Sequence, residues 1–129
     1  MAGRFASAVV LLGLGLVHPG AEAVADVAAG ERLFRSQCMG CHALEPGRHR
    51  AGPSLHAVIG RRAGTVDGFD FSRAMAEAGI TWTPATLDEF LADPMRTVPG
   101  TKMVFWGLEP AAAREHLIRY LEIAAGQPG

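Results

Sequence analysis

The sequence of 129 residues predicts an all-α protein, and two observations carry that expectation. The dipeptides Thr83-Pro84 and Asp93-Pro94 each place a capping side chain directly before a proline, an arrangement that begins a helix. Apolar residues near the C-terminus recur at the spacing of one helix face, which does not fit the alternation of a strand. These residues are Leu117, Ile118, Leu121 and Ile123.

Residues 1–23 have the pattern of a cleavable secretory signal peptide. Arg4 precedes an apolar run over residues 5–17, and the small-residue site Ala21-Glu22-Ala23 follows. Cleavage after Ala23 and cleavage after Ala25 both fit. The apolar run is shorter than the roughly 20 residues that span a bilayer, so we expect an exported, soluble protein that is periplasmic in a bacterium. An uncleaved signal would instead tether the protein to the membrane.

Residues 24–129 are expected to form one small domain. The formal net charge is −1, and removal of the signal leaves it unchanged because Arg4 and Glu22 depart together. A nearly neutral chain lacks the basic field that attracts nucleic acid or acidic lipid, so neither is an expected partner. A core of this size is marginal alone, and a large buried cofactor would supply apolar volume that it lacks.

The first helix is expected to begin at Asp26, whose carboxylate can cap it, and to lead into Cys38. Leu33 and Phe34 are apolar positions of this helix. Gly30 leaves a bare spot on one face, which invites close packing against another helix.

The two proline-led starts predict helices from Thr83 to about Ala92 and from Asp93 onward. The last helix is expected to begin near Pro110 and to end before Gly126.

Residues 46–79 form a long connection rich in glycine, arginine and proline, with a short helical candidate around residues 72–78. Connections of this length are uncommon inside a compact domain. We therefore expect this connection to wrap a large cofactor.

The run Cys38-Met39-Gly40-Cys41-His42 has the C-x-x-C-H form through which haem c is attached. The two thiols would bond the porphyrin and the imidazole would ligate the iron. They are the only cysteines in the chain, which leaves no ligands for a four-cysteine zinc or iron–sulfur site. The alternative is a thioredoxin-like dithiol pair, but that use does not require the histidine and normally accompanies alternating strands and helices.

Short runs in a fixed order extend over nearly all of residues 24–129 and resemble those of the class I c-type cytochromes, the small soluble mitochondrial and bacterial type. The runs are Cys38 to His42, Gly52-Pro53-Ser54-Leu55-His56, Gly60-Arg61-Arg62, Gly68-Phe69, Gly79-Ile80-Thr81-Trp82 and Pro99-Gly100-Thr101-Lys102-Met103. The resemblance implies the all-α cytochrome c fold, in which the first and last helices cross at Gly30 and Leu117 and loops wrap one covalent haem c.

The resemblance also implies the two axial ligands of the iron. His42 would be the proximal ligand and would donate its other ring N–H to the carbonyl of Pro53, which orients the ring. Met103 would be the distal ligand, since the turn at Pro99-Gly100 can hold the following backbone against the porphyrin. Other methionines and histidines compete for the distal position, namely Met75, Met95, His49, His56 and His116.

Each competing histidine also has an ordinary structural interpretation. We expect His49 to bond a neighbouring loop and His56 to lie on a loop face. His116 is expected on the exposed side of the last helix.

Four further cofactor-binding residues follow from the resemblance. Arg61 and the indole N–H of Trp82 would bond the haem propionates, because buried carboxylates need such partners. Thr101 would contact the other propionate or an internal water, and Phe105 would cover the haem edge near the distal ligand.

The chain departs from the mitochondrial type at several positions. Phe71 and Phe90 stand where tyrosines are common and Met75 stands where an asparagine is common, so the pocket is expected to be more apolar. Lys102 is the only lysine, which makes strongly salt-dependent docking doubtful. Trp106 is an unusual addition that the sequence assigns equally to docking or to packing.

We therefore expect a monomeric, monohaem carrier of single electrons between redox proteins, membrane complexes among them, that transforms no small-molecule substrate. Two alternatives stay open. One is a haem peroxidase or gas-binding module with a labile Met103, and the other is a haem subunit of a respiratory complex, held by an uncleaved signal.

Overall fold

The computed structural model describes residue 3 and residues 25–127. The predicted signal over residues 1–23 lies outside the described residues, apart from Gly3, and so does its end at Ala23. Between residues 25 and 127 the structure has helices and one isolated bridge, which joins Arg62 and Thr81, so the all-α prediction is confirmed. The helices are α1 (Val27–Leu33), the π-helical turn η1 (Phe34–Cys38), α2 (Arg73–Ala76), α3 (Pro84–Ala92), α4 (Pro94–Thr97) and α5 (Ala111–Ala124). None of these described helices is long and apolar enough to cross a membrane.

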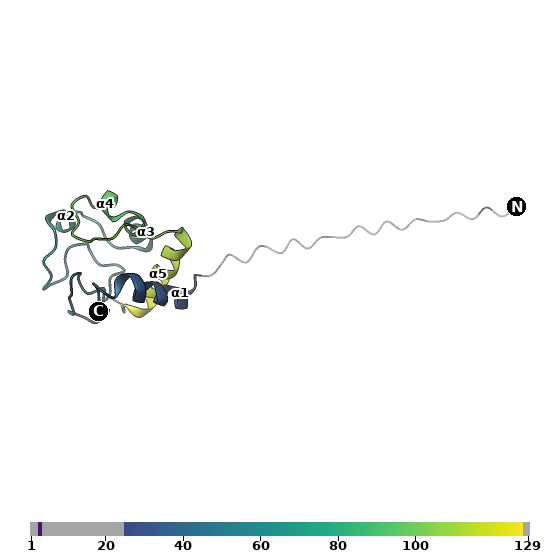
Figure 1. Ribbon diagram of the computed structural model, residues 1–129, viewed down its shortest axis with the longest axis horizontal. Helices are drawn as coiled ribbons and strands as arrows, with labels where there is room; N and C mark the ends of the chain where they lie inside the picture. The colour runs from purple at the N-terminus through teal and green to yellow at the C-terminus, as the bar shows by residue number, and fades with distance from the viewer. Residues whose placement is uncertain (1–2, 4–24, 128–129) are drawn as a thin grey trace.

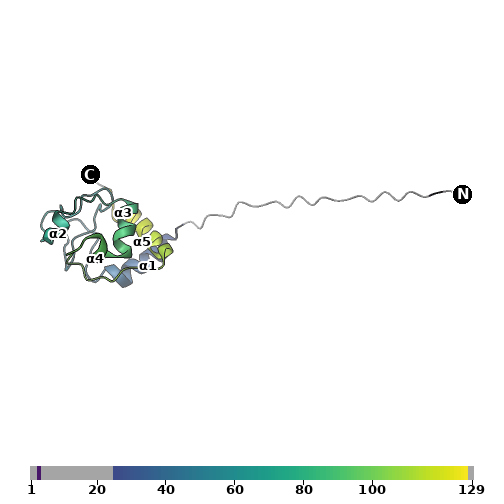
Figure 2. The same cartoon turned by 90° about the horizontal axis from the view of Figure 1, so that it is seen from above.

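The helices α1 and α5 pack directly against each other, and both views show them side by side (Figure 1, Figure 2). A Cβ atom at Gly30 would run into the backbone carbonyl of His116 and the side chain of Tyr120. The rings of Phe34 and Tyr120 lie 5.7 Å apart, and Leu117 is buried at the same contact. The predicted crossing at Gly30 and Leu117 is therefore confirmed.

The start of α1 is held both by its own capping residue and by a hydrogen bond to α5. The Asp26 carboxylate accepts hydrogen bonds from the backbone N–H groups of Ala28 and Ala29, as the predicted cap requires. The backbone N–H of Asp26 donates to Nδ1 of His116 on α5 at 2.9 Å. The prediction that His116 lies on the exposed side of the last helix is therefore wrong. The crossing turns this half-buried ring toward a backbone donor at the end of α1.

Both proline-led helix starts are confirmed. Thr83 and Thr86 form a reciprocal capping box at the first turn of α3. The Asp93 carboxylate accepts a hydrogen bond from the backbone N–H of Arg96 and so caps α4. These two local caps begin α3 and α4 where the sequence predicts, at Pro84 and Pro94.

His49 ties together two parts of the long connection over residues 46–79. Its Nδ1 accepts from the backbone N–H of Ser54 at 2.9 Å, and its Nε2 donates to the carbonyl of Asp67 at 2.8 Å. This confirms the prediction that His49 bonds a neighbouring loop. The short predicted helix is present as α2, capped by Ser72.

Arg114 is a buried cation that the sequence did not single out. On α5 it is only 8% exposed, and its Nε donates to the carboxylate of Asp88 on α3 at 2.7 Å. Its Nη1 donates to the carbonyl of Leu108 at 2.9 Å and pairs with Glu109 at 3.1 Å. One side chain therefore joins α5, α3 and the segment that precedes α5.

We expect Arg114→Ala to lower the free energy of unfolding by about 2 kcal/mol, because Asp88 and the carbonyl of Leu108 lose charged hydrogen-bond donors. Arg119→Ala is the matched control, since Arg119 forms an exposed pair with Glu122 on the same helix, and its loss should cost less than about 0.5 kcal/mol. Guanidinium unfolding of the haem-loaded protein, followed by far-UV circular dichroism, measures both. Equal losses in the two variants would contradict the structural role of Arg114.

Candidate functional site

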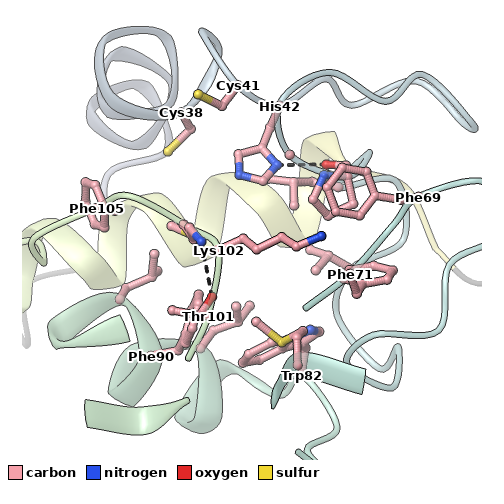
Figure 3. Close-up of a pocket in the computed structure, with 18 of the residues that line it drawn as sticks. Cys38, Cys41, His42, Phe69, Phe71, Trp82, Phe90, Thr101, Lys102 and Phe105 are labelled. Carbon is pink, nitrogen blue, oxygen red and sulfur yellow. Dashed lines mark hydrogen bonds between the residues drawn. The ribbon is translucent and has the colours of Figure 1, made fainter. Parts of the chain in front are cut away.

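A cavity lies between the end of η1, the long connection, α3, α5 and the segment over residues 101–105. Most of its lining is apolar, and Figure 3 shows aromatic side chains on several sides of it. Every cofactor-binding residue predicted from the sequence lines this cavity, namely Cys38, Cys41, His42, Met103, Pro53, Arg61, Trp82, Thr101 and Phe105. The fold thus gathers these predicted residues at one place.

The two cysteines stand at one edge of the cavity, and both thiols are free (Figure 3). The π-helical turn brings them there, with the backbone N–H of Met39 bonded to the carbonyl of Phe34 at 2.9 Å. Burial, with a smaller contribution from Cys41, raises the pKa of the Cys38 thiol to about 11. Residues 25–127 lack the alternating strands and helices that normally accompany a dithiol exchange pair, which disfavours the thioredoxin-like alternative.

His42 is buried, and a backbone carbonyl holds the orientation of its ring. Its Nδ1 lies 2.7 Å from the carbonyl oxygen of Pro53, which can only accept, so Nδ1 donates the hydrogen bond. The predicted bond between His42 and Pro53 is confirmed. Burial lowers the pKa of His42, and the nearby Arg61 acts in the same direction. The neutral ring therefore keeps an unshared electron pair on Nε2, the form that binds a metal.

Gly52 allows the connecting loop to press against this ring. A Cβ atom at position 52 would run into the imidazole of His42. The backbone N–H of Gly52 donates to the carbonyl of Cys41 at 2.8 Å, which holds the loop in place. The sequence analysis included Gly52 in the run Gly52-Pro53 but gave it no role. A glycine without a side chain allows close packing, and this becomes visible only when the neighbouring group, here the His42 ring, is known.

Thr101 and the residues that follow it form another wall of the cavity (Figure 3). The backbone N–H of Thr101 donates to the carbonyl of Val98 at 3.0 Å, which closes the turn at Pro99-Gly100. The hydroxyl of Thr101 accepts from the backbone N–H of Met103 at 3.3 Å. The position of Met103 is thus held by its own segment.

The structure narrows the set of competing ligands. Met95 is 51% exposed on α4 and does not line the cavity, whereas Met75 on α2 does. Neither His49 nor His56 lines the cavity, and His116 is bonded to the start of α1. Of the competitors within residues 25–127, Met75 is the one that remains beside Met103.

Arg61 reaches the cavity with part of its guanidinium committed to the backbone. It donates to the carbonyls of His56 at 2.8 Å and of Ser54 at 3.0 Å. Burial lowers the pKa of Arg61. A guanidinium carries five N–H donors, so further donors remain for an anionic group in the cavity.

Aromatic rings make up a second part of the lining. Trp82 is buried with its ring 5.0 Å from that of Phe90, and the rings of Phe69 and Phe71 meet edge to face at 4.9 Å. Phe105 lines another side of the cavity (Figure 3). The expectation of a more apolar pocket agrees with this lining.

Lys102 also lines the cavity (Figure 3). Its Nζ donates to the backbone carbonyl of Asp70 at 3.0 Å and pairs with the Asp70 carboxylate at 3.1 Å. The only lysine of the chain is therefore engaged by a neighbouring loop.

The donor set and the shape of this site fit a haem. Two thiols stand at one edge, beside a neutral imidazole whose ring is held in one orientation. A thioether is available on another wall, and the rest of the lining is apolar enough for a porphyrin. An all-α fold with these features defines the class of covalent haem c proteins.

Comparison with known proteins places the chain within this class. Residues 27–122 match the family model described as cytochrome c, and the chain belongs to this family. It is 43% identical over 102 residues to cytochrome c 2.1 of Caenorhabditis elegans, covering 79% of this chain and 92% of that protein. It is 41% identical over 101 residues to cytochrome c2 of Blastochloris viridis, covering 78% of this chain and 79% of that protein.

Among solved structures, the chain is similar to cytochrome cH from Methylobacterium extorquens, with a TM-score of 0.71 and 44% identity. The match covers 75% of this chain and 97% of that one. The cytochrome c fold, one covalently attached haem c with its iron, and the function of a monohaem electron carrier are therefore confirmed.

We expect Gly52→Ala to destabilise the haem-loaded protein by about 1–3 kcal/mol, because the added methyl group must displace the His42 ring or the loop. Gly40→Ala is the control, since a Cβ atom there meets no other group within 4 Å. Guanidinium unfolding at neutral pH compares the two. A Gly52→Ala variant as stable as the wild type would show that the ring is not confined as the structure indicates.

Proposed function

We propose that His42 and Met103 are the axial ligands of the iron and that Cys38 and Cys41 form the thioether bonds. The observation that carries this proposal is the hydrogen bond from His42 Nδ1 to the carbonyl of Pro53. It leaves Nε2 as the ligand atom of a buried ring, beside two free thiols. A bound haem c supplies reversible one-electron chemistry at its iron.

Met103 is preferred to Met75 as the sulfur ligand because of the segment that carries it. Met103 follows the turn at Pro99-Gly100, and its backbone N–H is held by Thr101. Met75 belongs to the first turn of α2, where its N–H is bonded to the capping hydroxyl of Ser72. The run from Pro99 to Met103 is also the one that matches the distal-ligand run of the family.

The remaining predicted residues complete the proposed haem site. Arg61 and Trp82 are proposed to bond the propionates, which the uncommitted N–H donors of Arg61 support. Thr101 is proposed to contact a propionate in addition to holding Met103. Phe105, which lines the cavity, is proposed to cover the haem edge.

The protein is proposed to move electrons without transforming a substrate. With His42 and Met103 both bound to it, a haem iron would have no open site for peroxide or a diatomic gas, and His/Met ligation would raise its potential. The partners are then redox proteins, with membrane complexes among them, and the carrier works as a monomer.

The working compartment is proposed to be the periplasm. The pattern over residues 1–23 supports export, and a mature chain that begins after Ala23 or Ala25 would be soluble. Retention of the signal would support the tethered haem subunit instead.

We expect Met103→Ala to abolish the weak far-red charge-transfer band of the ferric protein. It should also lower the midpoint potential by on the order of 100 mV, a fraction of the roughly 0.8 V over which axial ligands set haem potentials. The opened sixth position should raise peroxide turnover from a negligible rate. Visible spectra, potentiometry and a peroxidase assay measure these three effects.

Met75→Leu is the matched control, because Met75 also lines the cavity and the substitution conserves its volume. It should keep the charge-transfer band. Loss of the band in Met75→Leu but not in Met103→Ala would reverse the assignment, and peroxide turnover by the unaltered ferric protein would favour the peroxidase alternative.

We expect the protein isolated after expression with haem c maturation machinery to lack its first 23 or 25 residues and to fractionate with the soluble periplasmic contents. Intact-mass spectrometry of the haem-loaded protein identifies the first residue. An intact residue 1 in the membrane fraction would support the tethered subunit.

A further inference from the structure

Two apolar side chains beside the haem site are almost wholly exposed. Trp106 is 92% exposed and Val104 is 89% exposed, and the next most exposed of the large hydrophobic residues between 25 and 127, Ile123, reaches only 54%. They alternate along the chain with Met103 and Phe105, which are half-buried and line the cavity. Val104 stands at the rim of the same cavity, and Trp106 does not line it. These two exposed side chains are here called the 104/106 patch.

The backbone that carries the patch is held firmly just after Trp106. Gly107 has a φ of +104°, and a Cβ atom there would run into the carbonyl of Ala92. The backbone N–H of Leu108 donates to the carbonyl of Leu91 at 2.8 Å, and Arg114 donates to the carbonyl of Leu108. A tryptophan on a fixed backbone loses little conformational freedom on binding, as the aromatic anchors of protein interfaces do.

The charge next to the patch is neutralised within the protein. Lys102, two residues before Val104, is paired with Asp70 at 3.1 Å. A cation paired with a carboxylate produces little long-range field, so Lys102 does not steer a partner to the patch.

The size of the patch bears on what covers it. A buried tryptophan removes roughly 150–250 Å² from water, whereas a stable interface buries about 800 Å² on each partner. The patch is thus too small to hold a second copy of this chain, and it suits the brief contact of an electron-transfer encounter. It also lacks the basic residues that hold a protein to an acidic membrane surface.

We propose that the 104/106 patch is the docking surface for a redox protein partner whose own surface, around its redox centre, is apolar and uncharged. Trp106 is the anchor of this contact, and the contact depends little on salt. The inference rests on the proposed transfer of electrons to protein partners at the haem site.

The test measures second-order electron transfer from the reduced haem-loaded protein to a blue-copper protein whose copper edge is ringed by apolar side chains. Trp106→Ala should lower the rate constant about tenfold, as loss of an interface anchor does. Val104→Ala should lower it less, and Trp106→Phe should keep most of it. The wild-type rate constant should change by less than about twofold between about 10 mM and 200 mM ionic strength.

Ile123→Ala is the control for an exposed apolar side chain elsewhere, because Ile123 lies twelve residues along α5, about 18 Å from its start. It should leave the rate constant unchanged. Ferricyanide, a small oxidant that needs no docking surface, should react equally with every variant, and the charge-transfer band should persist. These two readouts separate failure of the patch from failure of the proposed haem ligation.

Unchanged rate constants in both Trp106→Ala and Val104→Ala would overturn the proposal. So would a faster, strongly salt-dependent reaction with a blue-copper protein whose docking face carries carboxylates. A concentration-dependent dimer in sedimentation that disappears in Trp106→Ala would assign the patch to a second copy instead. Binding to phosphatidylcholine vesicles that requires Trp106 would assign it to a lipid surface.

Discussion

The close contact between α1 and α5 at Gly30 is the constraint on which the rest of the structure depends. No side chain fits between Gly30 and the carbonyl of His116, so the two helices meet backbone to backbone. Because α1 runs directly into η1, this contact determines where Cys38 stands relative to Leu117, which lines the cavity from α5. The contact between α1 and α5 therefore also places Cys38 at the edge of the haem site.

The orientation of His42 is determined by the backbone around it rather than by other side chains. The carbonyl of Pro53 selects the tautomer, Gly52 lets the loop reach the ring, and the carbonyl of Cys41 holds the loop. Backbone partners carry no net charge, so they orient the ring without adding an ion to the apolar cavity. Arg61 is likewise held by the backbone, since two of its hydrogen bonds go to carbonyl oxygens.

The sequence predicted features whose cause is local. A capping side chain followed by proline predicts the starts at Thr83 and Asp93, because one residue satisfies donors of the next turn. The spacing of Cys38, Cys41 and His42 likewise predicts haem attachment from residues within a single turn. The roles of Arg114 and of the His116 ring could not be predicted, because their partners are brought close only by the packing of α5 on α3 and α1.

The number of residues between the two turns at Gly100 and Gly107 determines which side chains line the haem site and which are exposed. Exposure alternates along this segment, with Met103 and Phe105 half-buried and Val104 and Trp106 exposed. A shift of one residue would exchange Met103 with Val104 and Phe105 with Trp106. Both glycines have positive φ, +94° and +104°, and their neighbouring hydrogen bonds hold the ends of the segment. An insertion or deletion between them would therefore displace Met103, the proposed sulfur ligand, and also change the exposure of Trp106. The register that sets the environment of the haem is the same register that presents a surface to a partner.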